Sequence, residues 1–301
     1  MTRILILLAI LLAVGFVVWR FAAPQPSQEP ARPWPGPANI SELTIKGVLP
    51  DGSTSWNEIE VPPSPPPALE RGKDLFAKAC AACHGAEGKG DGILTKNYDL
   101  NSIPANLTKP LQSIKIRSTA SGAVPTDADL FRTLTRGLPN TAMWSYRALP
   151  AEDRWSLVHY VKSLGGDAYK SAPKVANIPA KLEKNAGLLE TGGTLYRNVC
   201  LNCHGAEGLG GNPPIYDSES GKQFPGLKFA QDGGKLMLGG SSDDDIARTL
   251  MTGFHSRSPM RSFQPYFYPH EAPTPSQKIE GDRKLWGTVF YSRELINAQA
   301  K

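Results

Sequence analysis

The chain has 301 residues, which is enough for two domains of ordinary size and a connecting tail. Its formal net charge of +5 comes from 33 basic and 28 acidic residues that are scattered along the sequence, which excludes the concentrated positive charge that binds nucleic acid. The four cysteines form two Cys-x-x-Cys pairs, and a histidine follows each pair directly. These two clusters are the strongest chemical signal in the sequence.

The N-terminus predicts attachment to a membrane. An almost unbroken apolar run extends from Ile4 to Trp19, between Arg3 and Arg20. The run is short for a spanning helix of about 20 residues, so a cleaved signal peptide is an alternative interpretation. A cut after Ala22 or Ala23 would put Arg20 or Phe21 where a signal peptidase requires a small residue, whereas Trp19 and Arg20 suit the interface of a membrane. We therefore expect residues 1–23 to form an uncleaved transmembrane anchor.

Residues 24–67 are rich in proline and end in a proline run at 62–67. This composition favours extended polyproline II structure over a packed core. We expect these residues to act as a tether. Short stretches at 42–48 and 58–61 could still form strands or lie against another surface.

Beyond the tether the sequence repeats itself, and the repeat sets the domain boundaries. Residues around the first cysteine pair recur around the second, and the similarity continues through a middle segment and a last aromatic segment. We place domains at 68–166 and 186–298, joined by a linker at 167–185. The matching residues are Gly72, Phe76, Asp129, Arg132, Gly137, Trp155 and Tyr160 in the first copy and Gly192, Tyr196, Asp245, Arg248, Gly253, Trp286 and Tyr291 in the second.

The spacing of apolar residues predicts three helices in each copy. They cover 69–82, 127–136 and 151–164 in the first copy and 187–202, 243–252 and 282–295 in the second. No alternating pattern predicts a strand between them, and Asp127 and either Ser242 or Asp243 are the expected N-caps. Three short helices with long loops provide little apolar core, so we expect a large apolar body to fill the middle of each domain.

The two cysteine clusters have the spacing of covalent haem attachment sites. Cys80, Cys83 and His84 form the first cluster, and Cys200, Cys203 and His204 form the second. On a helical turn, two thiols spaced in this way can both reach the vinyl groups of one porphyrin, and the next histidine can ligate its iron. The pairs could instead form one zinc site with four thiolates, or two redox-active dithiols. The histidine after each pair and the duplicated flanks favour two covalently bound haem c groups.

With these motifs, the sequence resembles the class I cytochrome c fold, twice over. A glycine and an aromatic residue precede each Cys-x-x-Cys-His motif, and aromatic residues mark each last helix. The resemblance implies a mainly α-helical protein with two tandem cytochrome c domains, each folded around a covalent haem. The transmembrane helix and the Pro-rich tether lie outside the resemblance.

The resemblance also implies the sixth iron ligands. Methionine is the usual choice of the family, because its soft thioether favours reduced iron. Met143 and Met260 occupy the same place in the two copies and follow loops similar to the family's Gly-x-Pro-Gly-Thr-x-Met sequence, so they are the expected ligands of haem 1 and haem 2. His255 and His270 are rivals of Met260. Packing roles are expected for Met237, Met251 and His159.

The second copy contains an insertion at 261–281 that the first copy lacks. Its aromatic residues are Phe263, Tyr266, Phe267 and Tyr268. Two interpretations are open for it. The loop covers an edge of the haem, or its aromatic side chains are exposed and dock a partner subunit.

These features predict an electron-transfer protein and not an enzyme. The positive-inside tendency holds Arg3 inside, which places the haem domains on the periplasmic face of a bacterial cytoplasmic membrane. Irons closed by histidine and methionine leave no position for a small-molecule substrate. The segments 116–122 and 125–130 resemble dihaem subunits that serve membrane-bound respiratory enzymes, which implies redox partner proteins or subunits of a respiratory complex.

Two other functions are the alternatives. A dihaem oxidoreductase that acts on hydrogen peroxide or a sulfur compound would need an iron with an open or displaceable sixth position. A haem sensor would need an output domain across the membrane, where only residues 1–3 are expected.

Overall fold

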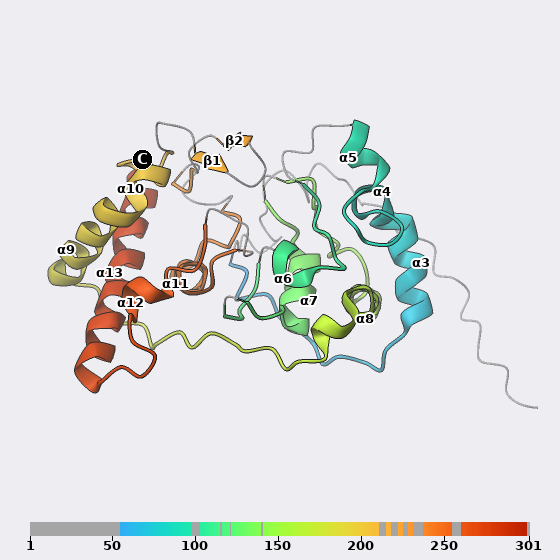
Figure 1. Cartoon of the computed structure of the whole chain (residues 1–301), viewed down its shortest axis with the longest axis horizontal. Helices are drawn as coiled ribbons and strands as arrows, with labels where there is room; N and C mark the ends of the chain where they lie inside the picture. The colour runs from blue at the N-terminus through green and yellow to red at the C-terminus, as the bar shows by residue number, and fades with distance from the viewer. Residues whose placement is uncertain are drawn as a thin grey trace, which may run out of the picture. The chain divides into compact units, whose positions relative to one another are not determined.

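Helices joined by loops make up most of the described part of the chain, as the apolar spacing predicted (Figure 1). The last helix is longer than predicted, with 25 residues from Pro275 to Gln299 where 282–295 was expected. This computed structural model describes residues 55–97, 103–114, 116–120, 122–139, 141–210, 215–217, 222–224, 228–230, 237–254 and 260–299. All of them belong to one compact unit, residues 37–301. The predicted anchor at 1–23 and most of the tether lie outside the described residues. None of the helices in the described ranges is both long enough and apolar enough to cross a membrane.

The first half of this unit confirms the three helices that were predicted for it. Its elements are α3 (Leu69–Ala79), α4 (Ala81–His84), α5 (Ile93–Asn97), α6 (Pro110–Ser113), α7 (Asp127–Arg136), α8 (Ala151–Gly165) and the 3-10 helix η1 (Gly166–Tyr169). The expected N-cap Asp127 is wrong, because Thr126 caps α7. Its hydroxyl accepts the backbone N–H of Asp129 at 3.0 Å, and the Asp129 carboxylate accepts the backbone N–H of Thr126 at 2.9 Å.

The second half repeats this plan with additions. Its elements are α9 (Ala186–Leu195), the π-helix η2 (Tyr196–Cys200), α10 (Leu201–His204), β1 (Ile215–Asp217), β2 (Lys222–Phe224), α11 (Asp243–Thr252), α12 (Gln264–Phe267) and α13 (Pro275–Gln299). Ser242 caps α11, as one of the two expected residues. The expectation of no strands was wrong, because β1 and β2 pair as antiparallel strands with Ile215 opposite Phe224. Strands of three residues are too short to show alternation in the sequence.

In each half the first helix crosses the last helix at a glycine. Helix α3 packs against α8, and α9 packs against α13. A Cβ atom added to Gly72 would overlap the carbonyl oxygen of Ser156, and one added to Gly192 would overlap the carbonyl oxygen of Gly287. Only glycine lets the two backbones approach so closely.

Aromatic side chains pack beside both crossings. The rings of Phe76 and Tyr160 lie 5.3 Å apart between centroids in the first half, and those of Tyr196 and Tyr291 lie 5.3 Å apart in the second. Tilted pairs at this distance add attraction beyond the area that they bury. The four positions match in the sequence repeat, so the repeat extends to side-chain packing.

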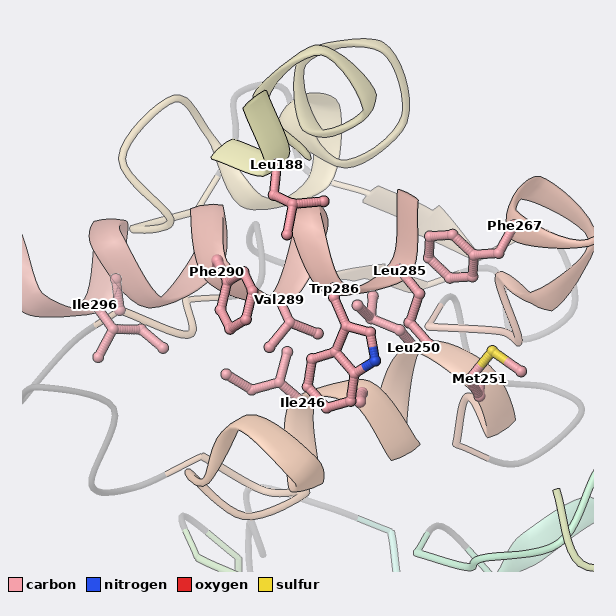
Figure 2. Close-up of a cluster of buried hydrophobic side chains, with 12 residues drawn as sticks. Leu188, Ile246, Leu250, Met251, Phe267, Leu285, Trp286, Val289, Phe290 and Ile296 are labelled. Carbon is pink, nitrogen blue, oxygen red and sulfur yellow. The ribbon is translucent and has the colours of Figure 1, made fainter. Parts of the chain in front are cut away.

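The second half has its own apolar core (Figure 2). Leu188 on α9 faces α13, and Leu250 on α11 lies on the other side of α13. The buried members of this cluster are Leu188, Ala230, Ile246, Ala247, Leu250, Met251, Phe267, Leu285, Trp286, Val289, Phe290 and Ile296. Met251 is 2% exposed, which confirms the packing role expected of it.

We predict that Gly72→Ala and Gly192→Ala each lower the free energy of unfolding by about 1 to 3 kcal/mol, because the added methyl group forces the crossing helices apart. Thermal or urea unfolding measures the change. Gly187→Ala, in the first turn of α9, is the matched control, since its nearest neighbour would lie 3.5 Å from the new Cβ. That variant should gain about 0.4 to 1 kcal/mol. A gain at Gly72 or Gly192 as well would contradict the tight crossing.

Candidate haem sites

An apolar cavity opens beside the first cysteine motif. Its volume is about 1040 Å³, including space open to solvent. Cys80, Cys83, His84 and Met143 all line it, so the structure brings the four predicted residues of haem site 1 around one space. Its apolar walls include Phe76, Leu107, Ile114, Leu134, Val158 and Val161. The helices α3, α7 and α8 therefore surround the cavity on several sides.

The first motif is held on a single helical turn. The backbone N–H groups of Cys83 and His84 both donate to the carbonyl of Cys80, at 3.1 and 2.8 Å. The two thiols, three residues apart on this turn, share a face. Gly85 ends the turn with φ of 79°, a conformation that side-chain-bearing residues rarely adopt.

The imidazole of His84 is prepared for metal ligation. Its Nδ1 lies 2.9 Å from the carbonyl oxygen of Ala105, which can only accept, so Nδ1 carries the hydrogen and Nε2 is left to bind a metal. Burial lowers the pKa of His84, which keeps the ring neutral. Neutral imidazole is the form that ligates iron.

The cysteines do not have the properties of the alternative sites. Burial, with a smaller effect of the neighbouring thiol, raises the pKa of Cys80 to about 12 and that of Cys200 to about 11. A redox-active dithiol needs a lowered thiol pKa. Among the residues that the structure describes, no three Cys, His, Asp or Glu side chains gather in a way that could hold a metal ion. Neither zinc nor dithiol chemistry is supported by this arrangement.

Met143 lies on a loop that its own hydrogen bonds close. The backbone N–H of Leu138 donates to the carbonyl of Met143 at 2.7 Å, and the hydroxyl of Thr141 donates to the carbonyl of Leu138 at 2.8 Å. The N–H of Met143 in turn donates to the Thr141 hydroxyl at 3.0 Å. This network fixes the backbone of the methionine that lines the cavity.

The second half closes the equivalent loop in the same way. The N–H of Phe254 donates to the carbonyl of Met260 at 2.8 Å, although this loop is longer than the one before Met143. Of the rival ligands, His255 lies outside the described residues, and His270 is exposed on the surface. The carbonyl of Met260 therefore accepts the hydrogen bond that matches the one to Met143, and its role as ligand of haem 2 stays a prediction.

The second Cys-x-x-Cys-His motif makes the same backbone hydrogen bond as the first. The carbonyl of His204 accepts the N–H of Gly210 at 2.8 Å, as the carbonyl of His84 accepts the N–H of Gly90 at 2.7 Å. The ring of His204 meets the edge of Phe229, with centroids 5.0 Å apart. Much of the segment between α10 and α11 lies outside the described residues.

The insertion at 261–281 mostly packs against the second half. Phe267 is 2% exposed, and the hydroxyl of Tyr268 donates to Asp282 at 2.6 Å. Phe263 and Tyr268 pack against the apolar core shown in Figure 2. Tyr266, at 45% exposed, is the only one of the four aromatic side chains of the insertion that is largely exposed to solvent. The idea that these aromatic residues form an exposed docking group is not supported.

Three buried arginines were not foreseen from the sequence. Arg117, Arg136 and Arg248 are each at most 3% exposed, and the Nε atom of each lacks a hydrogen-bond partner in the part of the chain that the structure describes. Of the three, only Arg248 could be singled out from the sequence, because it matches Arg132 in the repeat. Their terminal guanidinium nitrogens donate to backbone carbonyls, among them those of Phe254, Leu238 and Gly239.

The residues around the first cavity fit a covalent haem c on two counts. A flat porphyrin needs apolar walls, two thiols for its vinyl groups and two axial ligands for its iron, and the cavity is lined by residues of each kind. The high thiol pKa values also suit groups that are consumed as thioethers instead of working as thiolates.

Comparisons with known proteins agree with this geometry. Residues 69–165 match the protein family described as Cytochrome c. The chain is therefore a cytochrome c domain protein, whose cofactor is haem c, and its two Cys-x-x-Cys-His motifs indicate two haems.

Two individual proteins are similar to the chain. The Cbb3-type cytochrome c oxidase subunit CcoP of Azospirillum sp. (strain B510) is 31% identical over 145 residues, which cover 46% of this chain and 40% of that protein. The chain thus matches less than half the length of this relative. A chain from the Kuenenia stuttgartiensis reducing HAO-like protein complex Kustc0457/Kustc0458 is 30% identical, with a TM-score of 0.63 over 79% of this chain and 100% of that one.

We predict that Met143→Ala and Met260→Ala each remove the low-spin His/Met signature of one haem in low-temperature EPR and near-infrared magnetic circular dichroism of the oxidised protein. The thioether is lost in each case, and the affected iron becomes high-spin or takes another ligand. Met251→Leu, in the core, is the control and should leave both signatures intact. A second haem that is indifferent to Met260→Ala would reject that ligand.

Proposed function

We propose that this protein is a membrane-anchored dihaem cytochrome c that passes single electrons between its two haems and docked redox proteins. In this proposal, residues 68–166 and 186–298 are two cytochrome c domains. Cys80 and Cys83 attach haem 1, whose iron is held by His84 and Met143. In the second domain, Cys200, Cys203, His204 and Met260 have the same roles.

One observation carries the proposal: two thiols, an imidazole and a thioether line a single apolar cavity. Bound haem supplies an iron that gains or loses one electron. In this proposal His84 and Met143 would both ligate the iron of a bound haem, which would leave no vacancy for a substrate. His84 is oriented by the Ala105 carbonyl, and the Met143 loop is fixed by its own hydrogen bonds. Such a site favours electron transfer over bond chemistry.

The rim of the cavity offers a surface for electron exchange. Ile103 and Trp144 both line it and are 69% and 38% exposed. Exposed apolar side chains at the mouth of a cofactor site are typical of surfaces where a protein partner docks briefly. An electron can therefore pass through this rim, between a haem held in the cavity of domain 1 and a docked protein.

The names of the similar proteins support a place in a redox complex. One is a subunit of a cytochrome c oxidase, and the other is a chain of a redox protein complex. We extend this to a respiratory partner for the present chain. The apolar N-terminal run supports anchoring in the bacterial cytoplasmic membrane, with both haem domains on the periplasmic face.

We expect a reductive titration to take up one electron for each of the two motifs, and the reduced wild type to bind no carbon monoxide, because both irons are closed. Optical spectra measure both properties. Met143→Ala is the positive control, since it opens one iron and should bind carbon monoxide there. Carbon monoxide binding by the wild type, or turnover of hydrogen peroxide or thiosulfate, would contradict the proposal and favour a dihaem oxidoreductase.

A further inference from the structure

Residues 55–59, which were predicted as part of the tether, are packed into the body of the protein. Trp56 is 0% exposed and forms a buried cluster with Ile59 and Ile116. Side chains from both halves pack against this cluster, among them Leu138 from the first half and Phe254 from the second. These two residues follow the matching glycines of the repeat. The cluster around the Trp56 indole is therefore packed against matching positions of the two halves.

The first half contributes residues of its own haem cavity to this cluster. Ile116 and Leu138 line the cavity beside the first cysteine motif and also contact the Trp56 cluster. On the other side, Phe254 begins the loop that leads to Met260. Leu138 and Phe254, which pack against the Trp56 cluster, thus begin the loops that lead to the predicted ligands Met143 and Met260.

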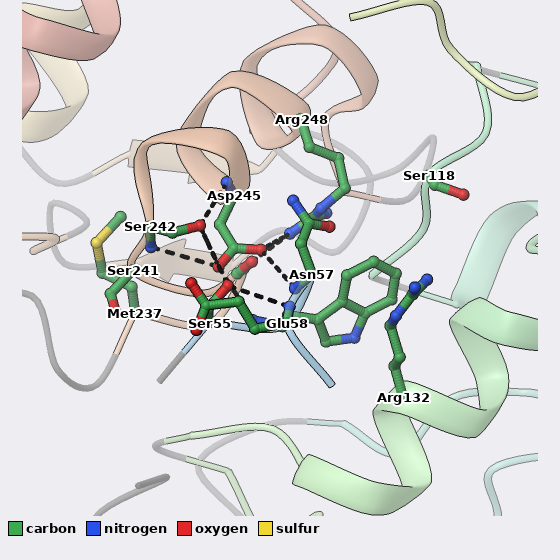
Figure 3. A network of polar contacts seen from close by, with 12 residues as sticks. Ser55, Asn57, Glu58, Ser118, Arg132, Met237, Ser241, Ser242, Asp245 and Arg248 are labelled. Atoms are coloured by element: carbon green, nitrogen blue, oxygen red, sulfur yellow. Dashed lines mark hydrogen bonds and ion pairs between the residues drawn. The ribbon is translucent and has the colours of Figure 1, made fainter. Parts of the chain in front are cut away.

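A carboxylate of the second half holds the backbone of this segment (Figure 3). The Asp245 side chain accepts the N–H of Trp56 at 3.0 Å and the N–H of Asn57 at 3.1 Å. The hydroxyl of Ser55 lies 3.2 Å from that of Ser242. Because Asp245 also completes the capping box of α11, the segment is attached to the start of that helix.

Equivalent arginines of the two halves bind the indole. The guanidinium carbon of Arg132 lies 5.1 Å from the ring centroid of Trp56, and that of Arg248 lies 4.5 Å from it. Both distances are in the range of cation–π attraction. Arg132 also donates from Nε to the carbonyl of Ile59 at 3.3 Å. One aromatic ring is thereby shared between matching positions of the two repeats.

Direct contacts between the halves surround this ring. Arg136 donates to the carbonyls of Leu238 and Met237 at 3.0 and 2.9 Å, and Arg117 donates to the carbonyl of Phe254 at 2.6 Å. These bonds join buried guanidinium groups to fixed backbone oxygens, so they define the relative position of the halves as well as holding them. Two of the accepting residues, Leu238 and Phe254, also pack against the Trp56 cluster.

The segment then continues along the first half. The indole N–H of Trp155 on α8 donates to the carbonyl of Pro62 at 3.2 Å, and Ser64 lies 3.0 Å from Nε2 of His159. His159 therefore contacts the former tether. Residues 55–64 run from the N-terminus of α11 in one half to α8 in the other.

We propose that residues 55–59 act as a strap between the two haem domains, and that Trp56 is a positioning residue that keeps the two haems at one separation. This inference rests on the proposed function. Electrons then move within a rigid pair: one iron is oxidised from Fe(II) to Fe(III) as the other is reduced from Fe(III) to Fe(II), and no bond or proton changes place. Because electron tunnelling decays steeply with distance, the strap sets the rate of this step.

The test compares Trp56→Ala with Trp56→Phe in the full haem-loaded protein. Nε1 of Trp56 has no hydrogen-bond partner among the described residues, so phenylalanine should retain most of the function of the ring. Two readouts are followed: amide hydrogen exchange at residue 57, and electron redistribution between the haems after a flash of a photoreductant. For Trp56→Ala we expect exchange to be roughly a hundredfold faster and redistribution about tenfold slower or more, while the spectrum of each haem stays unchanged.

A matched pair of variants covers the case in which Trp56→Ala does not fold. Asp129 and Asp245 occupy the same position in the repeat, and each completes a capping box, but only Asp245 binds the strap. Asp245→Ala should therefore speed hydrogen exchange at residue 57 and slow electron redistribution between the haems. Asp129→Ala should lower the stability of helix α7 and leave both of these quantities unchanged.

Equal effects of Asp129→Ala and Asp245→Ala, or unchanged exchange and redistribution in Trp56→Ala, would overturn the strap. If the wild type shows no electron redistribution between haems, the proposed function fails. If exchange then responds only to Trp56→Ala and Asp245→Ala, residues 55–59 still join the halves, but the positioning role is rejected.

Discussion

The contact between the first and the last helix of each half is the constraint on which the rest of the structure depends. At Gly72 and Gly192 the crossing helices touch backbone to backbone, with no room for a side chain. A contact of this kind fixes both the distance and the angle between two helices, and paired aromatic rings fill the space beside it. The cysteine motif follows directly from the first helix of the pair, so the crossing also decides where the thiols lie.

The crossing helices of the first half leave a space beside Cys80 that the side chains of the protein do not fill. Protein interiors are packed as densely as organic crystals, and an apolar cavity with the dimensions found beside Cys80 is costly to leave open. The helices α3, α7 and α8 are too short and too few to close it with their own side chains. A covalent haem c would supply the missing apolar body, and the long loops and short helices could then form a stable domain around it. The cofactor would be part of the core as well as the redox centre.

The sequence predicted the parts of this structure that repeat. Helices α7 and α11 have the predicted bounds, because capping residues and apolar spacing mark both ends. The two Cys-x-x-Cys-His motifs were equally easy to recognise, because each is formed by neighbouring residues in the sequence. The break between α3 and α4 was missed because a tertiary requirement of the motif overrides helix propensity there. The buried arginines and the position of Trp56 could not be foreseen, since they depend on contacts between residues more than a hundred positions apart.

Those long-range contacts change how the N-terminal segment is understood. Its proline content indicates an extended backbone, and residues 60–65 carry no helix, strand or turn, but residues 56–59 form a turn in which the N–H of Ile59 donates to the carbonyl of Trp56 at 3.4 Å. Extended conformation is nevertheless compatible with burial when each exposed backbone group finds a partner, and here Asp245, Arg132 and Trp155 provide partners. Residues 55–59 contain no proline, so binding them costs more conformational entropy than binding the prolines at 62–67. Composition therefore describes the backbone of the proline run, while the partners in the two halves decide that residues 55–59 belong to the folded body.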